Sequence, residues 1–274
     1  MSHSKGFTLA EMAVAVVILA ILLFGAMVPF STQVDIRNLA ETRRTMDSIK
    51  EAIIGFTQAN GRLPCPALGT TPTAVAGAGT EQFSAVTNTC TATFGVVPWV
   101  TLSTPETDTW NRRFSYWVSP IFADAPPNSP PPVLITFSSP GQTPACAPTP
   151  APIQSSFALC SLGIFTVNTR NDGTHAALAV GNALPAVFIS HGKNGYGAFI
   201  PSGVTLPAPT GADETANANH STGATNFFSR SPTAAASGCN DASGGQPFCE
   251  FDDIVVMISS NVLIARMVAA GKLP

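Results

Sequence analysis

The sequence predicts an α+β protein in which one long N-terminal helix packs on a β-rich, loop-rich globular head. Three observations support this fold class. Residues 12–34 form an uncharged apolar run, apolar residues continue at helical spacing to residue 60, and the remaining chain alternates short β-branched runs with glycine and proline. The chain holds 22 Gly and 24 Pro, and only 11% of it is charged, against roughly a quarter in soluble domains. A head with long irregular loops follows.

The N-terminal apolar run is long enough to cross a membrane. From Met12 to Val34 there is no charged side chain, and a helix of that length spans the roughly 30 Å hydrocarbon core of a bilayer. Lys5 precedes the run, so the positive-inside tendency keeps the start of the chain in the cytoplasm. A secretory signal peptide would have a shorter apolar region followed by a small-residue cleavage site. We therefore expect a single span with the rest of the chain exported.

The helix is predicted to continue beyond the apolar run. Apolar residues recur at helical spacing at Leu39, Met46, Ile49, Ile53 and Phe56. Gly61 suits a C-terminal cap, and Pro64 blocks further helix. The sequence thus predicts one helix over residues 7–60.

The head is predicted to contain an antiparallel sheet and a terminal helix. Six short apolar or β-branched runs are bounded by turn residues and read as strands: Phe94–Val100, Phe114–Val118, Val133–Phe137, Leu162–Val167, Ala186–Ser190 and Ile254–Ser259. The segment Asn261–Ala270 can form a helix that Asn261 caps and Gly271 ends. Residues 201–247 form a long irregular run, and loops of that length are usually functional or disordered.

Six cysteines lie in a chain that is expected to be exported. They are Cys65, Cys90, Cys146, Cys160, Cys239 and Cys249. Because thiols are oxidised outside the cytoplasm, we expect disulfides. Six cysteines allow about 15 pairings, and the sequence does not choose among them. Pairing in sequential order would close three compact loops. No C-x-x-C pair suggests a zinc site.

A short motif precedes the apolar run. The cleavage and methylation site of type IV prepilins and type II secretion pseudoprepilins resembles the stretch Gly6-Phe7-Thr8-Leu9-Ala10-Glu11. The resemblance implies that a prepilin peptidase cuts after Gly6 and methylates Phe7. It also implies that Glu11 pairs with the N-terminal amine of a neighbouring subunit. A charge at the start of a membrane helix is costly unless it is paired, and such pairing removes that cost.

The resemblance also implies an organisation and a function. Residues 1–6 would be a leader peptide, 7–60 the helix with 7–34 as its membrane and filament part, and 61–274 a periplasmic head. The chain would sit in the inner membrane and then enter a pilus or pseudopilus as a structural and assembly subunit. Its partners would be prepilin peptidase, other pilins or pseudopilins, an inner-membrane platform protein and an assembly ATPase. The large head favours a minor subunit, and an alternative is a tip adhesin or receptor-binding minor pilin that uses its long loops.

Four stretches of the head also look like blocks of larger pilin-like proteins. They are Arg62–Pro66, Asp108–Phe114, Ser190–Gly197 and Phe251–Val256. The block around Trp110 is similar to an Asp-Pro-Trp-Gly-Asn stretch of major pseudopilins, with Thr109 in place of the proline and Asn111 in place of the glycine. Calcium stabilises the head of some major pseudopilins, which makes Asp252 and Asp253 candidate ligands, because a hard cation prefers carboxylate oxygen. We expect no other cofactor.

The remaining patterns argue against two other classes of function. A net charge of −3 and a pI near 5.7 do not suit a nucleic-acid-binding surface, which needs clustered Lys and Arg. His175, His191 and His220 could serve a hydrolytic triad, but no G-x-S-x-G elbow or other placed nucleophile accompanies them. The glycines around Lys193 lack the P-loop spacing. We therefore expect neither nucleic-acid binding nor enzymatic activity.

Overall fold

The computed structural model describes residues 8–124 and 155–273, apart from the side chains of residues 22–32. It divides into two compact units, residues 1–41 and residues 42–274. The helix α1, Leu9–Asn60, supplies residues to both units. It ends where Gly61 takes a φ of +72° and donates its N–H to the carbonyl of Thr57, as a glycine C-terminal cap does.

The first unit consists of the N-terminal part of α1. Most of its described apolar side chains are exposed, including Leu9, Val16 and Ile21. Among the residues whose side chains are described, no helical segment combines the length and apolar character needed to cross a membrane.

The second unit is built on a four-stranded sheet. Its strands are β3 (Phe94–Val96), β4 (Ser115–Val118), β7 (Ala186–Ser190) and β9 (Ile254–Ile258). They follow the order β3-β4-β7-β9, and every pair is antiparallel. The predictions for β4, β7 and β9 are confirmed to within one residue at each end. The run predicted as Phe94–Val100 is a strand only to Val96, because Pro98 is followed by the short helix α2 (Trp99–Leu102).

A second sheet lies beside the first. It contains β6 (Ala177–Leu184), β5 (Phe165–Arg170) and β8 (Asn226–Phe228), in the order β6-β5-β8. The expected antiparallel sheet is the four-stranded one, whereas in this second sheet the pair β5 and β8 is parallel. The strand predicted at 162–167 begins three residues later, and β6 and β8 were not predicted. The run predicted at 133–137 lies outside the described residues.

Short elements complete the described part of the unit. They are β1 (Phe83–Ser84), β2 (Thr89–Cys90), α3 (Pro120–Ala123), α4 (Ala212–Asn217) and α5 (Ser260–Ala269). The terminal helix is confirmed, but its N-cap is Ser259 and not Asn261, which already lies within the helix. Gly271 follows its end with a φ of +68°, as predicted for a terminating glycine.

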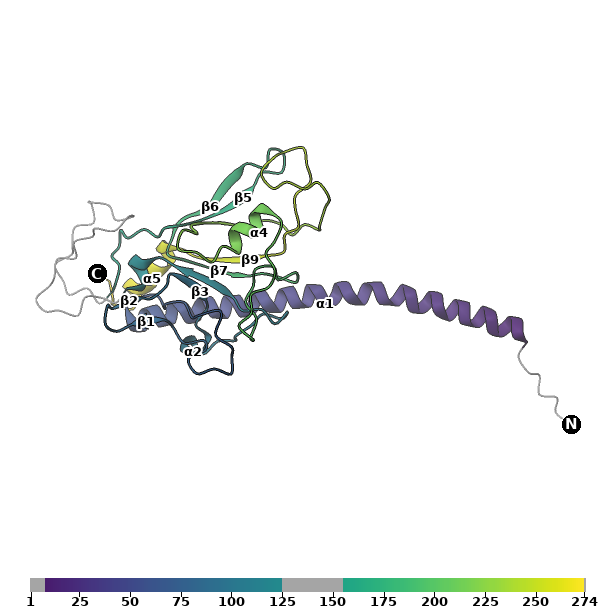
Figure 1. Cartoon of the computed structure of the whole chain (residues 1–274), viewed down its shortest axis with the longest axis horizontal. Coiled ribbons are helices and arrows are strands. Elements are labelled where there is room, and N and C mark those ends of the chain that lie inside the picture. Colours follow the sequence, from purple (N-terminus) through teal and green to yellow (C-terminus); the bar gives the residue numbers. More distant parts are fainter. Residues whose placement is uncertain (1–7, 125–154, 274) are drawn as a thin grey trace, which may run out of the picture. The chain divides into compact units, whose positions relative to one another are not determined.

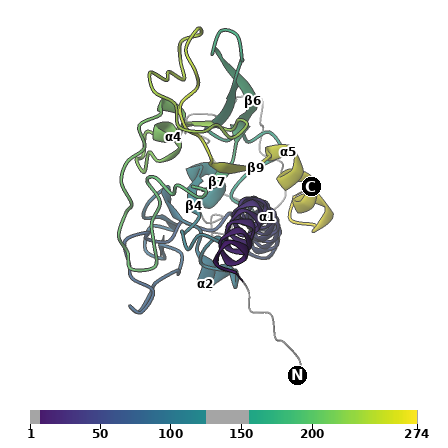
Figure 2. The same cartoon turned by 90° about the vertical axis from the view of Figure 1, so that its right-hand side faces the viewer.

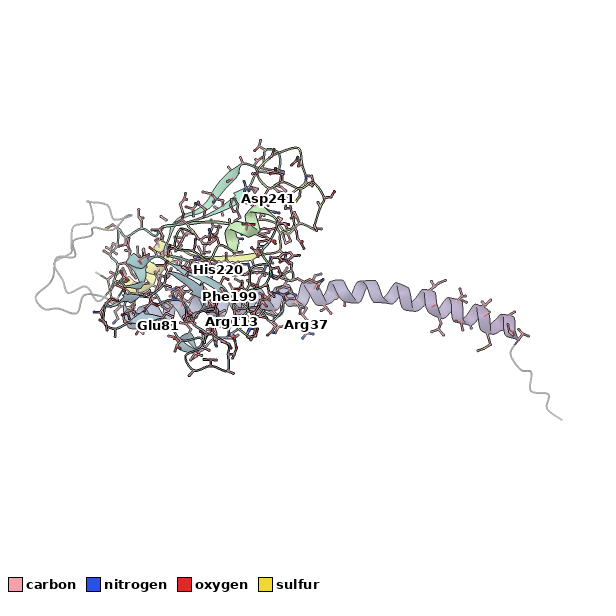
Figure 3. All side chains as sticks on the ribbon, in the orientation of Figure 1. Arg37, Glu81, Arg113, Phe199, His220 and Asp241 are labelled. Atoms are coloured by element: carbon pink, nitrogen blue, oxygen red, sulfur yellow. A yellow bond between two sulfur atoms is a disulfide. The ribbon has the colours of Figure 1, made fainter. Side chains whose placement is uncertain are left out.

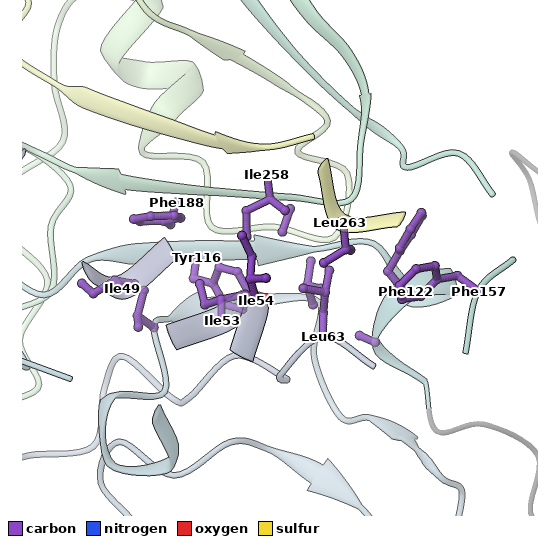
Figure 4. Close-up of a cluster of buried hydrophobic side chains, with 14 of the residues drawn as sticks. Ile49, Ile53, Ile54, Leu63, Tyr116, Phe122, Phe157, Phe188, Ile258 and Leu263 are labelled. Carbon is purple, nitrogen blue, oxygen red and sulfur yellow. The ribbon is translucent and has the colours of Figure 1, made fainter. Parts of the chain in front are cut away.

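The four-stranded sheet is the middle of three layers. Successive side chains of a strand point to opposite faces. Tyr116 packs with Ile49 and Ile53 of α1 (Figure 4), and Val118 belongs to the same apolar cluster. On the other face, Trp117 packs with residues of β5 and β8. In Figures 1 and 2, the C-terminal part of α1 lies on one side of the four-stranded sheet, and strand β6 lies on the other side. The sheet's two apolar faces therefore hold the head together.

Disulfides fasten the loops of the head. Cys65 is bonded to Cys90, and Cys239 to Cys249, which confirms two of the three sequential pairs. Cys160 is also disulfide-bonded. Its predicted partner, Cys146, lies outside the described residues.

Candidate functional site

The N-terminus of α1 carries a reciprocal pair of hydrogen-bonded side chains. The hydroxyl oxygen of Thr8 accepts the backbone N–H of Glu11 at 3.3 Å. In return, Oε2 of Glu11 accepts the backbone N–H and the hydroxyl of Thr8, each at 2.8 Å. This is a capping box, in which the residue before the helix and the third helical residue satisfy each other's N–H groups. The carboxylate also lies at the end of the helix where the macrodipole favours negative charge.

Two of the three predicted N-terminal site residues cannot be placed beside this box. Gly6 and Phe7 lie outside the described residues. Glu11 is exposed within the first unit. Thr8 was not predicted as a site residue, although the spacing Thr-x-x-Glu is itself a capping-box signal.

Three of the four blocks singled out in the sequence of the head, Asp108–Phe114, Ser190–Gly197 and Phe251–Val256, meet at one place. The hydroxyl of Ser190 donates to Oδ2 of Asp108 at 2.7 Å, and the guanidinium of Arg112 donates to the carbonyl of Lys193 at 2.8 Å. Gly195 has a φ of +67°, and a Cβ at this position would lie 1.8 Å from Nε of Arg112. Only glycine allows both this backbone conformation and this close approach. The segment Ser190–Gly197 is thus a tightly held turn.

The third block reaches the same turn through its acids. The backbone N–H of Asn194 donates to Oδ2 of Asp252 at 2.8 Å. Nδ1 of His191 lies 3.2 Å from Oδ1 of Asp253, and the amide of Asn217 donates to the other oxygen of that carboxylate at 2.8 Å. Hydrogen bonds therefore link the turn after β7 to the residues just before β9 and, through Asp253, to α4.

Ser115, His191 and Asp253 are linked by hydrogen bonds in the same sequence of contacts, hydroxyl to imidazole to carboxylate, as the residues of a hydrolase triad. The hydroxyl oxygen of Ser115 lies 2.9 Å from Nε2 of His191. With Nδ1–H of His191 donating to Asp253, Nε2 accepts the Ser115 hydroxyl, which in turn accepts Nε2–H of His220 at 3.0 Å. His220 packs against Phe199, with ring centroids 4.6 Å apart (Figure 3).

This arrangement is closed to a substrate. Ser115 and His191 are 0% exposed, and a cavity of about 490 Å³ beside α4 is lined by neither of them. His175, the third histidine considered above, lies elsewhere, with Nδ1 2.8 Å from the carbonyl oxygen of Asn240. Because a nucleophile must reach its substrate, these contacts suit a buried polar network that fixes the head, not a hydrolytic centre.

Glu214 brings a third carboxylate to the predicted calcium ligands. Oxygen atoms of Glu214, Asp252 and Asp253 lie within 4.8 Å of one another. Burial and then the charge of Asp253 raise the pKa of Glu214 to about 7, and burial raises the pKa of Asp252 to about 6. Carboxylate oxygens of this kind can hold a hard cation. A proton shared between two of the carboxylates would also reduce the repulsion between their charges. The sequence did not point to Glu214 because it is far from the two aspartates along the chain.

Comparisons with known proteins bear on the N-terminus. Residues 1–27 match the family model described as the prokaryotic N-terminal methylation motif. No curated protein and no solved structure matches the chain. The matched residues include the stretch Gly6–Glu11 and the capping box that begins α1. The N-terminal segment of the chain therefore carries a prokaryotic N-terminal methylation motif, and this match supports a type IV pilin-like protein of the prepilin type.

Proposed function

We propose that this protein is a structural and assembly subunit of a type IV pilus or of a type II secretion pseudopilus. Prepilin peptidase would cut after Gly6 and methylate Phe7. The observation that carries the proposal is the match of residues 1–27 to the N-terminal methylation motif. The buried Ser115 and His191 support a role without catalysis.

The same proposal includes a place in the cell. The uncharged run Met12–Val34 would anchor the unassembled subunit in the inner membrane, with the head in the periplasm. Residues 7–34 would then pass into the core of the filament. Assembly would involve the platform protein, the assembly ATPase and other pilins or pseudopilins. The disulfides Cys65–Cys90 and Cys239–Cys249 agree with an oxidising compartment.

A second candidate function is contact with a receptor at the tip of a filament. The disulfide between Cys239 and Cys249 closes a short loop whose residues 242–246 are exposed. Asp241 holds this loop from inside, because its carboxylate accepts the N–H groups of Asp213 and Cys249. A loop held in this way is pre-organised for binding.

The functional proposal is tested in a strain that lacks the chain and is complemented with variants. Wild type is expected to restore filaments or export and to appear in the assembled fraction. Glu11→Ala is expected to remain in the membrane fraction. Asp172→Ala changes an exposed acid in the β5–β6 turn and is expected to behave as wild type. Wild-type protein that never enters an assembled fraction would overturn the proposal.

One loop variant, expressed in the same strain, distinguishes the two candidate roles. Replacing residues 242–246 by a Gly-Ser segment of equal length leaves both cysteines in place. A receptor role predicts normal filaments with lost adhesion. A purely structural role predicts that filaments, adhesion and export are all unchanged.

A further inference from the structure

Strand β6 is an edge strand, and none of the described strands pairs with its free side. The three-stranded sheet has the order β6-β5-β8, so β6 pairs only with β5. Figures 1 and 2 show β6 at the outside of the head, and its residues 177–180 are all exposed. Leu178 and Val180 keep 49% and 51% of their surface in solvent. The first half of β6 therefore projects beyond the apolar core that Leu184, at its other end, enters.

The backbone of β6 offers hydrogen-bonding groups on this free side. Near the turn between β5 and β6, the N–H of Asn171 donates to the carbonyl of Ala176 at 3.0 Å. In an antiparallel pair, residues whose backbone groups face the partner strand alternate with residues whose groups face away. Leu178 therefore faces β5, and Ala177 and Ala179 direct their N–H and C=O groups away from it.

The free edge lacks the features that usually keep edge strands apart. Such strands are protected by charged side chains, by proline, or by bulges that twist the edge away. The strand Ala177–Leu184 contains no charged residue and no proline. Its pairing with β5 is regular from Ala177 to Ala179 and shifts register only beyond that point. A further strand can therefore add to this edge.

The side chains of this edge favour a second copy of the same strand. From Ala177 to Gly181 they are small, large, small, large and small, a pattern that is the same in both directions. When two copies run antiparallel with Ala179 opposite Ala179, Leu178 of each copy lies opposite Val180 of the other. Two apolar pairs then form on one face, and only small residues meet on the other. No like charges meet, because the strand carries none.

We infer that the free edges of β6 in two copies of this chain pair antiparallel, with Ala179 opposite Ala179. Each copy supplies the same surface, so the contact is self-complementary. The two Ala179 residues exchange both N–H···O bonds, and Leu178 and Val180 occupy the non-hydrogen-bonded positions, where Cα atoms approach to about 4.5 Å. The two three-stranded sheets become one continuous sheet. The inference concerns the head and does not rest on the proposed function.

The test measures the register of this contact by disulfide crosslinking of the full chain in detergent. The apolar N-terminal segment can hold copies together by itself, so oligomeric state alone does not report on β6. Ala179→Cys, Leu178→Cys and Val180→Cys are each oxidised alone, and the last two are also oxidised as a mixture. Asp172→Cys, at an exposed position in the turn between β5 and β6, is the control.

The inferred register predicts which variants form covalent dimers. Ala179→Cys is expected to crosslink about tenfold more than Asp172→Cys, because directly opposite residues lie within the Cα separation of about 4.4–6.8 Å that a disulfide bridges. The mixture of Leu178→Cys and Val180→Cys is expected to crosslink, and each of these two alone far less. Two copies of residue 178, or of residue 180, lie diagonally across the pair at about 7–8 Å.

Two further substitutions in both members of the mixture test whether backbone pairing holds the contact. Ala179→Pro removes an N–H that faces away from β5, so it spares the hairpin but removes two bonds between the copies, and crosslinking is expected to fall about tenfold. Ala179→Lys places like charges opposite each other without restricting the backbone and is expected to act in the same direction. Urea midpoints show that each variant remains folded.

Two kinds of result would overturn the inference. If the mixture crosslinks no more than its members alone, or Ala179→Cys no more than Asp172→Cys, the two edges do not pair in this register. If neither Ala179→Pro nor Ala179→Lys lowers crosslinking in a folded chain, the contact does not depend on strand pairing. The proposed function stands in either case, because processing and assembly are measured separately.

Discussion

His220 stacks on Trp117, with ring centroids 5.4 Å apart and an interplanar angle of 4°. Burial, and then the neighbouring His191, lower the pKa of His220 from its ordinary 6.5 to about 3. The ring is therefore neutral in the folded head and becomes protonated on unfolding below pH 6.5. Its contribution to stability is complete above pH 6.5 and is lost as the pH falls towards 3.

This linkage predicts acid-sensitive stability. Between pH 7.5 and 5, wild type is expected to lose about 1–2 kcal/mol of unfolding free energy through this group. His220→Gln keeps an N–H donor without the titration, so it is expected to be less stable at pH 7.5 but to lose less on acidification. Urea unfolding of the full chain in detergent at the two pH values measures the loss of unfolding free energy on acidification for wild type and for His220→Gln. Equal losses in the two proteins would show that His220 does not carry the linkage.

The stability of the folded head also depends on Arg113. Its side chain is completely buried and pairs with Glu106 at 2.8 Å. It also donates to the carbonyls of Gly69 and Thr71, and its guanidinium lies over the ring of Trp99, 4.7 Å from the centroid. These contacts join the segment 69–71 to the loop that carries Glu106 and to Trp99 of α2.

Arg113→Lys is expected to destabilise the head by about 3–5 kcal/mol, because an ammonium cannot reproduce the planar fork and leaves buried groups unpaired. Arg266→Lys serves as the control, since Arg266 and Glu51 form an exposed pair at 3.5 Å. That change is expected to cost less than about 0.5 kcal/mol. Denaturant unfolding of the two variants compares them, and similar losses would contradict the role given to Arg113.

The two described disulfides are expected to stabilise the head unequally. Their cysteines are 10 and 25 residues apart in sequence. By loop entropy, removing Cys239–Cys249 costs about 3 kcal/mol and removing Cys65–Cys90 slightly more, about 3.5 kcal/mol. Paired Cys→Ser replacements, unfolded in urea without reductant, give both values. Unchanged unfolding midpoints in both double variants would show that the bonds do not constrain the unfolded chain.

The sequence predicted the features that are encoded locally. Strand β7 and the end of α1 follow from β-branched runs and from Gly61, and neither depends on distant residues. The parallel pairing of β5 with β8 was missed because Asn226–Phe228 is only three residues long and shows no periodicity. Its pairing depends on how the long segment folds back over the sheet.

The site was predictable to a similar degree. Asp252 and Asp253 were found as neighbours in sequence, whereas Glu214 reaches them only through tertiary folding. Ser115 meets His191 because β4 pairs with β7, with Ser115 opposite Ile189. Such cross-strand neighbours depend on register, which a single sequence does not specify.

The most direct test of the central claim is the mass of the mature N-terminus. The protein is extracted from membranes beside a Gly6→Ala variant, and both are analysed by mass spectrometry. The account predicts a native chain that begins at N-methylated Phe7 and a variant that keeps its leader. An intact Met1 in the native protein, or cleavage beyond Phe30, would contradict it.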